Sequence, residues 1–196
     1  MKLVQVEITG TAPLLMHRFG EEAEVEGAKP TRRVQLHERP PREQAERAAY
    51  RDSDGALYIP GAAVARLLRE AGGSHKQKGS RKSVKYLVPS AVLVSADTLP
   101  LLNGVGPLTD YEVDSRPVTI PSTKGRVMRH RPRLDAWRLE VDLEIDEDIL
   151  PAEMVHQLLV EGGRGIGLGD FRPERGGPFG RFRVTRWDER EADPES

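Results

Sequence analysis

Residues 162–184 read GGRGIGLGDFRPERGGPFGRFRV, and eight of these 23 residues are glycine while five are arginine. Glycine alone adopts positive φ freely and lets another backbone approach closely. A loop of this composition is typical of a segment that holds a polyanion against main-chain amides, with cations over its phosphates. The alternative is a flexible surface loop that leads into a strand.

The segments on either side place this stretch between a helix and a strand. Acidic residues and Pro151 predict a helix over about 151–161, which Gly162 and Gly163 would cap, and residues 179–187 predict a final strand. A dinucleotide fingerprint requires glycines after a strand and before a helix, and a Walker loop ends in GKS or GKT. Neither pattern is present, so the sequence predicts no nucleotide cofactor.

Apolar periodicity predicts the remaining elements of the chain. They are a strand at 2–9, a short helix at 41–49, a small hairpin at 50–60, a helix at 61–71, an edge strand or two short pieces within 84–94, and a strand at 135–144. Without the small hairpin, the order is strand, helix, strand, strand, helix, strand. This order predicts an α+β, ferredoxin-like (RRM-like) βαββαβ core with an antiparallel sheet ordered 4-1-3-2 and both helices on one face.

The domain prediction follows from these elements. Residues 1–188 are expected to form a single domain with insertions at 20–60 and 97–133, followed by a disordered tail at 189–196. The stretch at 21–40 is polar and irregular, which indicates an exposed insertion. Residues 97–115 are expected to be loop, and residues 116–133 to form a projecting basic hairpin.

The composition excludes several classes of protein. The chain has 196 residues, of which 37% are hydrophobic and 31% charged, and it has no cysteine. Disulfides, thiolate zinc sites and cysteine nucleophiles are therefore excluded. No apolar run is long enough to span a membrane, and no signal-peptide pattern follows Met1, which favours the cytoplasm.

The formal net charge is −1, but the cations are concentrated in three segments. Residues 76–85 and 116–133 carry cations and no acid, and the glycine-rich stretch adds its arginines. Three separate basic segments on a nearly neutral protein indicate a polyanion-binding face. The alternative is three solvated loops paired with nearby acids.

The order of these elements and the glycine-rich loop resemble the RAMP superfamily of CRISPR-associated RNA-binding proteins. The specific motifs are residues 163–180 and the basic hairpin at 116–133, which resembles the thumb-like hairpin of the superfamily's backbone subunits. The resemblance implies a subunit that polymerises along a guide RNA in antiviral defence. The chain departs from that pattern in its short length and in the phrase at residues 167–173. The alternatives are therefore a RAMP-like protein of a phage or mobile element and a divergent effector subunit.

The histidines predict no metal site, because His17, His37, His75, His130 and His156 lack metal-ligand spacing. His156 is expected to be structural. His17 follows the first strand and could lie beside a loop-bound phosphate. By the same resemblance, some RAMP proteins are metal-independent endoribonucleases that use a histidine in this region as acid or base, although they pair two ferredoxin-like domains.

The nucleic acid is predicted to lie along the loops. The open face of the predicted sheet would present Glu140, Asp142 and Glu144 and no aromatic residue, unlike an RNA-binding sheet. Main-chain amides at 165–169 would hold phosphates, and Phe171 and Phe19 are candidate stacking residues. The predicted nucleic-acid-binding residues are Arg164, Gly165, Gly167, Gly169, Phe171, Arg172, Arg175, Lys124, Arg126, Arg129, Arg131, Lys76, Lys78, Arg81, Lys82, His17 and Arg18.

The sequence thus predicts a non-enzymatic binder of single-stranded nucleic acid, RNA rather than DNA, that multimerises along the strand. Its partners would be the nucleic acid and further copies of itself or other subunits of a ribonucleoprotein, with no membrane, metal or cofactor. Two alternatives remain open. One is an endoribonuclease that uses His17, and the other is a structural or assembly protein that binds no nucleic acid.

Overall fold

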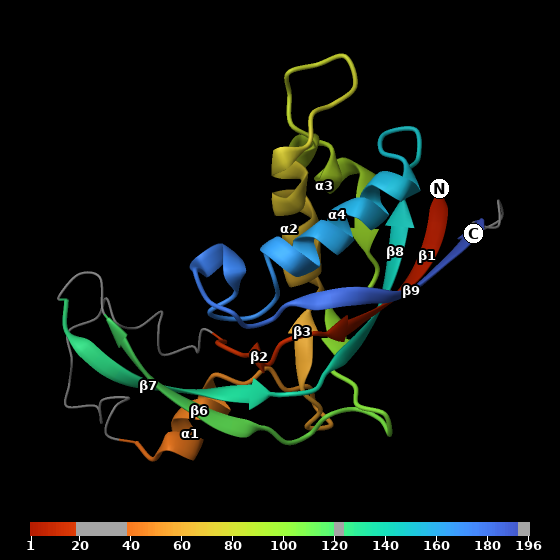
Figure 1. The fold of residues 1–196 in the computed structure, drawn as a ribbon. Coiled ribbons are helices and arrows are strands. Elements are labelled where there is room, and N and C mark those ends of the chain that lie inside the picture. Colours follow the sequence, from red (N-terminus) through yellow and green to blue (C-terminus); the bar gives the residue numbers. More distant parts are fainter. Residues whose placement is uncertain (19–38, 120–123, 192–196) are drawn as a thin grey trace, which may run out of the picture.

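The computed structural model describes residues 1–18, 39–119 and 124–191 and contains a four-stranded antiparallel sheet (Figure 1). Its strands are β1 (Lys2–Gly10), β4 (Val92–Val94), β8 (Arg138–Ile145) and β9 (Phe182–Glu191), in the order β4-β8-β1-β9. Helices α2 (Gly61–Ala71) and α4 (Ala152–Gly165) pack against each other and on the sheet. The predicted α+β class is confirmed.

The hydrophobic core lies between this sheet and the two helices. Alternate residues of β1 and β8 face the helices, and Val6 and Leu139 have no exposed surface. Leu67 and Leu68 of α2 and Leu158 of α4 fill the space opposite them. This alternation is what the period-2 and period-3.6 patterns in the sequence require. None of the helices in the described residues is long and apolar enough to span a membrane.

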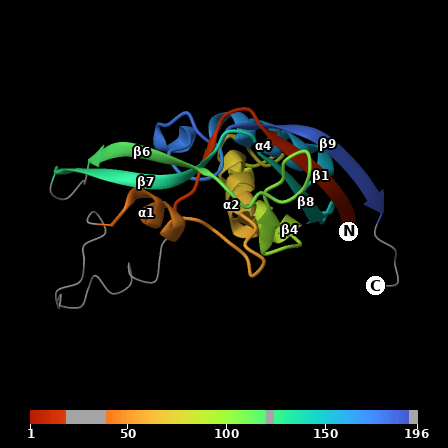
Figure 2. The same ribbon diagram turned by 90° about the horizontal axis from the view of Figure 1, so that it is seen from below.

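A second sheet projects from this core. It is formed by β2 (Leu14–Leu15), β7 (Arg126–Leu134) and β6 (Glu112–Thr119), in that order. The short helix α1 (Pro41–Arg47) packs against the β6–β7 hairpin (Figure 2). The hairpin is longer than predicted, because β6 begins at residue 112 within the stretch expected to be loop. The sequence places the turn of this hairpin at residues 122–125, of which 122 and 123 lie outside the described residues.

Two further predictions on irregular segments were partly wrong. Residues 97–115 also contain β5 (Thr98–Pro100), which pairs with β3 (Tyr58–Pro60). The small hairpin is therefore reduced to a turn at 52–55 closed by an Arg51–Leu57 bridge. The insertion predicted at 21–40 falls almost entirely at 19–38, outside the described residues.

The edge strand predicted within 84–94 is only three residues long. The segment starts with a 3-10 helix, η4 (Val84–Tyr86), continues as α3 (Val88–Ala91), and joins the sheet only at β4. Pro89 stands in the first turn of α3, where its missing N–H is not needed and its fixed φ suits a helix. The β-branched residues of this stretch predict a longer strand, but Pro89 favours a helical turn before β4.

Helix α4 continues past the two glycines that were expected to end it. Gly162 and Gly163 are buried inside the helix, where it crosses α2 and β9. A Cβ on Gly163 would overlap the carbonyl oxygen of Phe182, so the glycine permits close packing rather than a left-handed cap. The last strand also differs from its prediction: it starts at Phe182 and continues to Glu191, into the predicted tail. Residues 192–196 lie outside the described residues.

The antiparallel registers give the sheet two distinct ends. Gly10, Arg138 and Phe182 lie together at one end, which we call the hairpin end. Lys2, Ile145 and Glu191 lie at the other, the terminal end. The chain passes from β1 to β2, from β7 to β8 and from α4 to β9 at the hairpin end. The segment from α2 to β4 crosses at the terminal end. Loops at the same end of the sheet can contribute to one site, whereas loops at opposite ends cannot.

Candidate nucleic-acid interface

The loop after α4, residues 166–181, packs against the segment after β1. Asp170 N–H donates to the Leu15 carbonyl at 2.8 Å, and Gly180 N–H donates to the Pro13 carbonyl at 2.8 Å. Gly169 has a φ of 73°, and a Cβ there would overlap the Leu15 carbonyl oxygen. At this position the backbone requires glycine on two independent grounds.

The main-chain amides of this loop are used within the protein. Ile166 and Gly167 N–H both donate to the Gly162 carbonyl, at 3.0 and 2.9 Å, and Leu168 N–H donates to the Gly180 carbonyl at 2.9 Å. The prediction that amides at 165–169 form a phosphate cradle is therefore wrong for these three. The glycines shape the loop, and side chains must provide the contacts to an anion.

Asp170 lies at the meeting point of three segments. Its Oδ2 is 2.5 Å from Nη1 of Arg131 on β7 and 3.4 Å from Nδ1 of His17. Burial opposes ionisation of Asp170, but the hydrogen bond with His17 and the charge of Arg131 outweigh it and hold the pKa of Asp170 well below its ordinary value. No pattern of residues predicts that this acid in the loop pairs with His17.

Arg131 is only 5% exposed, and its Nε has no hydrogen-bond partner in the described residues. Its guanidinium is directed at Asp170 inside the protein. The structure therefore replaces the predicted direct contact of Arg131 with a nucleic acid by an internal role, which is to hold Asp170 and through it His17.

Arg172 is also occupied within the loop. It donates to the Gly169 carbonyl at 2.7 Å and to Glu174, which also binds Arg66 of α2 at 2.5 Å. Burial opposes ionisation of Glu174, but these two arginines lower its pKa below the ordinary value. Arg175, in the 3-10 turn η5 (Pro173–Arg175), is exposed and forms no ion pair in the described part of the chain. Of Arg172 and Arg175, only Arg175 is available to an outside anion.

Phe171 is presented to solvent by a strained backbone. Its φ is 46°, its side chain is 36% exposed, and its ring centroid is 6.0 Å from that of buried Phe179. The guanidinium of Arg116 lies over the Phe179 ring at 4.6 Å. A non-glycine residue in this region of φ costs about 1–2 kcal/mol, and such strain concentrates at functional sites. Phe19, the other predicted stacking residue, lies outside the described residues.

The face of the hairpin that carries Arg131 changes character along its length. At the base of the hairpin, Glu112 stands opposite Arg133 and Asp114 opposite Arg131, so the charges are complementary. One step outward, Arg116 stands directly opposite Arg129, and Arg116 bonds back to Asp114 at 2.8 Å. Asp114 therefore neutralises Arg116, whereas Arg129 forms no ion pair in the described residues. Lys124 and Arg126 are exposed farther out, and Arg18 is exposed beside His17.

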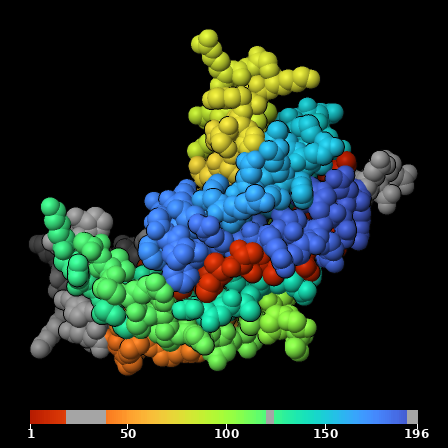
Figure 3. Space-filling model, viewed as in Figure 1, coloured from red at the N-terminus to blue at the C-terminus, as the bar shows by residue number. Residues whose placement is uncertain are grey.

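The basic loop at residues 76–82 is not part of this site. Lys76, Lys78, Arg81 and Lys82 follow α2 and lie at the terminal end, and Figure 3 shows this yellow segment at a different extremity from the green hairpin. The single polyanion face predicted from three basic segments was therefore wrong: the topology brings two of them together and separates the third. Arg164 is exposed on the last turn of α4, and Gly165 beside it has open space around it.

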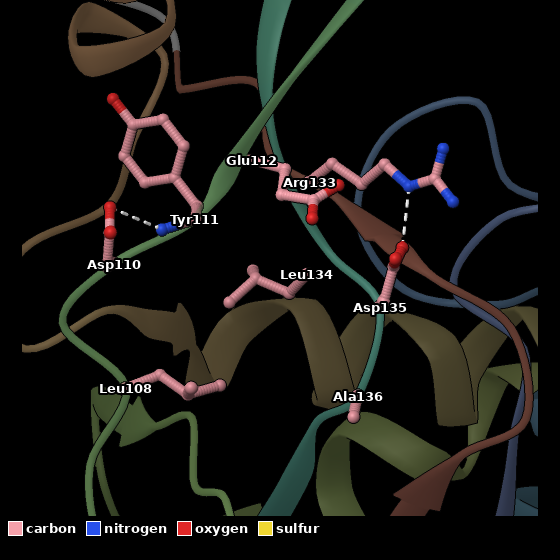
Figure 4. Close-up of a pocket in the computed structure, with 8 residues that line it drawn as sticks. All are labelled: Leu108, Asp110, Tyr111, Glu112, Arg133, Leu134, Asp135 and Ala136. Carbon is pink, nitrogen blue, oxygen red and sulfur yellow. Dashed lines mark hydrogen bonds and ion pairs between the residues drawn. The ribbon is translucent and has the colours of Figure 1, made fainter.

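A pocket of about 290 Å³ lies at the base of the hairpin (Figure 4). Its lining includes Asp110, Glu112 and Asp135, with Arg133 bonded to Asp135 at 2.6 Å. The Tyr111 hydroxyl donates to Glu46, and burial together with that bond raises the pKa of Tyr111 to about 12. Three carboxylates around one paired arginine make this pocket unsuited to a phosphate, so we leave it out of the interface.

The other predicted residues have ordinary explanations. His156 packs edge-on to Trp187 with ring centroids 4.8 Å apart, in agreement with a structural role. Within residues 1–18, 39–119 and 124–191, no group of three histidines, cysteines or carboxylates could hold a metal ion. The residues that sequence reasoning missed are Arg116, Phe179 and Asp170, since only the fold reveals which side chains they meet.

Comparison with known proteins places the fold. No protein-family model matches the sequence, and no curated protein matches it. A chain in the cryo-EM structure of the type III-B Cmr-β complex bound to cognate target RNA aligns over 96% of this chain with a TM-score of 0.59 and 12% identity. A chain of a type IV-B CRISPR complex aligns over 99% of this chain and 95% of its own length, with a TM-score of 0.44 and 15% identity.

The first of these similarities shows a fold of the kind present in CRISPR-associated complexes. This chain spans 60% of the length of the Cmr-β chain that it matches.

Proposed function

We propose that this protein is a non-enzymatic subunit of a CRISPR-type ribonucleoprotein that binds single-stranded RNA at the hairpin end of its sheet. The observation that carries the proposal is Arg129, which forms no ion pair in the described residues. It stands opposite Arg116, whose guanidinium lies over the ring of Phe179 next to the exposed Phe171. An available cation next to an exposed aromatic ring matches the backbone and the base of a single strand.

The architecture supports the same proposal. With β1, β4, β8 and β9 taken as first to fourth strands, the sheet reads 4-1-3-2, which is the ferredoxin-like order. The RAMP-like reading of the sequence rests on that order and on the loop after α4. The structural neighbour with the same fold was solved in a complex bound to its target RNA.

The contacts divide between phosphates and bases. Arg129, Arg175, Lys124 and Arg126 would bind phosphates, and Phe171 would stack on a base. His17, held by Asp170, would donate a hydrogen bond to the RNA. Because Arg131 and Arg172 are committed internally, they position the loop rather than the RNA. The hairpin reaches beyond the core (Figure 1), so we include the next subunit along the strand among its partners.

Fluorescence anisotropy with labelled oligouridine at two salt concentrations tests the proposal. Binding should weaken steeply with salt, with log K falling by about 0.7 for each phosphate neutralised. The double substitution Arg129→Gln/Arg175→Gln should weaken binding at least tenfold and reduce that slope. The matched control, Arg183→Gln/Arg190→Gln on exposed positions of β9, removes the same charge and should change little. Absence of binding at low salt would refute the proposal.

A second candidate function is metal-independent RNA cleavage by His17. One observation favours it: Asp170 lies 3.4 Å from His17 Nδ1, and the imidazole is 37% exposed, so an oriented histidine faces solvent at the proposed RNA site. RNA incubated in EDTA with wild type and with His17→Ala separates the two functions. Cleavage that requires His17 supports catalysis, whereas intact RNA with undiminished binding supports the non-enzymatic subunit.

A further inference from the structure

The basic loop at the terminal end is an ordered structure rather than a loose connection. Its two arms pair through Gln77 N–H to the Lys82 carbonyl and Val84 N–H to the His75 carbonyl, both at 2.9 Å. Ser83 Oγ donates to the Gly72 carbonyl at 2.7 Å, and His75 bonds to Glu161 of α4 at 2.6 Å. The loop therefore holds its side chains on a fixed frame tied to both helices.

The cations of this loop lack the acidic partners that most other cations of the surface have. In the described part of the chain, no carboxylate lies within ion-pair distance of Lys76, Lys78, Arg81 or Lys82, and all four are exposed. The neighbouring acids are already engaged: Glu70 binds Lys85 and Arg69, and Glu161 binds His75 and Gln157. The loop thus carries four uncompensated positive charges.

An exposed aromatic ring accompanies these charges. Tyr86 is 72% exposed, and its N–H donates to the Ser83 carbonyl at the end of the loop. The residues between the cations are Gln77, Gly79 and Ser80, so the loop offers no apolar surface of the kind that forms the centre of a protein interface. Exposed cations followed in the chain by an exposed ring suit a single nucleic-acid strand, which offers both phosphates and base faces.

We propose that residues 75–86 form a second contact site for single-stranded nucleic acid, separate from the hairpin end, with Tyr86 as its stacking residue. The two sites lie at opposite ends of the sheet, so they hold different stretches of a strand, or two strands. This site goes beyond the function proposed above, because it requires no contact at the hairpin end.

The test titrates a short labelled oligouridine into four proteins. They are the wild type, the loop variant Lys78→Gln/Lys82→Gln, the hairpin-end variant Arg129→Gln/Arg175→Gln, and the control Arg183→Gln/Arg190→Gln. The loop variant should lower the salt slope by about 1.4, that is 0.7 for each of two charges, and the control should not. In the hairpin-end background, the loop substitutions should remove the binding that remains.

Tyr86 is tested by two substitutions. Tyr86→Phe keeps the ring and should bind as wild type, whereas Tyr86→Ala should weaken binding about fivefold or more. Equal affinities for the two variants would overturn the stacking role. A loop variant that binds oligouridine like the control would overturn the site. If that variant differs from wild type only in its self-association on size exclusion, the loop contacts an acidic protein surface instead.

The outcomes also separate the two proposals. If the loop substitutions weaken binding and the hairpin-end substitutions do not, the second site stands and the proposed function fails. If only the hairpin-end substitutions weaken binding, the proposed function stands and the second site fails. Absence of oligouridine binding by the wild type overturns both.

Discussion

Asp170 connects the loop after α4 to the hairpin and to the segment after β1. It is a partly buried carboxylate between a buried arginine and a half-exposed histidine, and its backbone N–H donates to Leu15. A carboxylate in this position stabilises the fold and the proposed site at once. The same side chain that fixes the loop also orients His17 toward the region where RNA would bind.

Asp170→Asn should lower the free energy of unfolding by about 2–3 kcal/mol at neutral pH, because buried Arg131 would lose its ionised partner. The pKa of Asp170 is lower in the folded chain than in the unfolded chain. Its stabilisation is therefore complete above the unfolded pKa of about 4 and is lost as the pH falls toward the folded pKa. Urea unfolding at several pH values should show the difference between wild type and Asp170→Asn shrinking below about pH 4.

The exposed Asp148 provides the control for this pH dependence, since Asp148→Asn removes a carboxylate that forms no ion pair in the described residues. A deficit of Asp170→Asn that stays constant from neutral to acidic pH would contradict an ionised pair between Asp170 and Arg131.

Substitutions at Gly169 and Gly176 distinguish the cost of backbone strain from the cost of lost close packing. Both have positive φ, 73° and 77°, but only Gly169 has a carbonyl in the place of a Cβ, whereas Gly176 faces open space. Gly176→Ala should lower the free energy of unfolding by about 1 kcal/mol, from backbone strain alone. Gly169→Ala should lower it by about 3 kcal/mol or more, from strain and overlap together. Urea unfolding followed by tryptophan fluorescence measures both. Equal losses would show that the Leu15 contact is unimportant.

At the level of elements, the sequence predicted those whose burial follows one regular period. Helix α2 has the predicted bounds of 61–71, and β1 and β8 differ from their predictions by a few residues, because each buries one face against the same core. The misread segments are those where tertiary contacts override local signals. Pro89 starts a short helix in an apparent strand, and Gly162 and Gly163 continue a helix that they were expected to end.

The candidate site was predictable only in part for the same reason. Composition identified the basic hairpin and the glycine-rich loop, and the fold does bring these two together. Whether a given arginine can bind an outside anion depends on whether an acid of the protein already pairs with it. The pairing of Arg131 with Asp170 and that of Arg172 with Glu174 could not be predicted from the sequence. The position of the third basic segment depends on which end of the sheet a connection crosses, and this follows from the strand order alone.

Helix α4 provides a prediction at this scale. Gly163 and Gly165 both lie in its last turns, but only Gly163 is crowded, by Phe182 of β9, whereas Gly165 has open space. Gly163→Ala should destabilise the protein by about 2 kcal/mol or more by forcing α4 from the sheet, and Gly165→Ala should leave stability unchanged or raise it by up to about 1 kcal/mol. Thermal unfolding compares the two. A stabilised Gly163→Ala would contradict the close packing of α4 on β9.

At the scale of the whole molecule, the two ends of the sheet have different surroundings. The hairpin end carries the facing arginines and the exposed Phe171, and the terminal end carries the unpaired cations of residues 76–82. The net charge is only −1, so long-range attraction to RNA must come from these local concentrations rather than from the overall charge. Cations at both ends and a projecting hairpin are the features on which the proposed repeated binding along one strand rests.

Side-by-side assembly on RNA gives the corresponding prediction. The mass of the complex, measured by sedimentation, should increase in steps with the length of an oligouridine, because each added stretch of strand admits another copy. Replacing residues 117–128 by Asn-Gly joins Arg116 to Arg129 through a two-residue turn and preserves their cross-strand pair. This variant should bind a short oligouridine more weakly than wild type, because Lys124 and Arg126 are lost with the deleted residues. It should in addition lose cooperative loading on a long oligouridine, since the part of the hairpin that would reach a neighbour is gone. Undiminished cooperativity in the variant would show that the hairpin does not join subunits. A wild-type mass that does not grow with RNA length would show that the protein acts as a single RNA-binding copy.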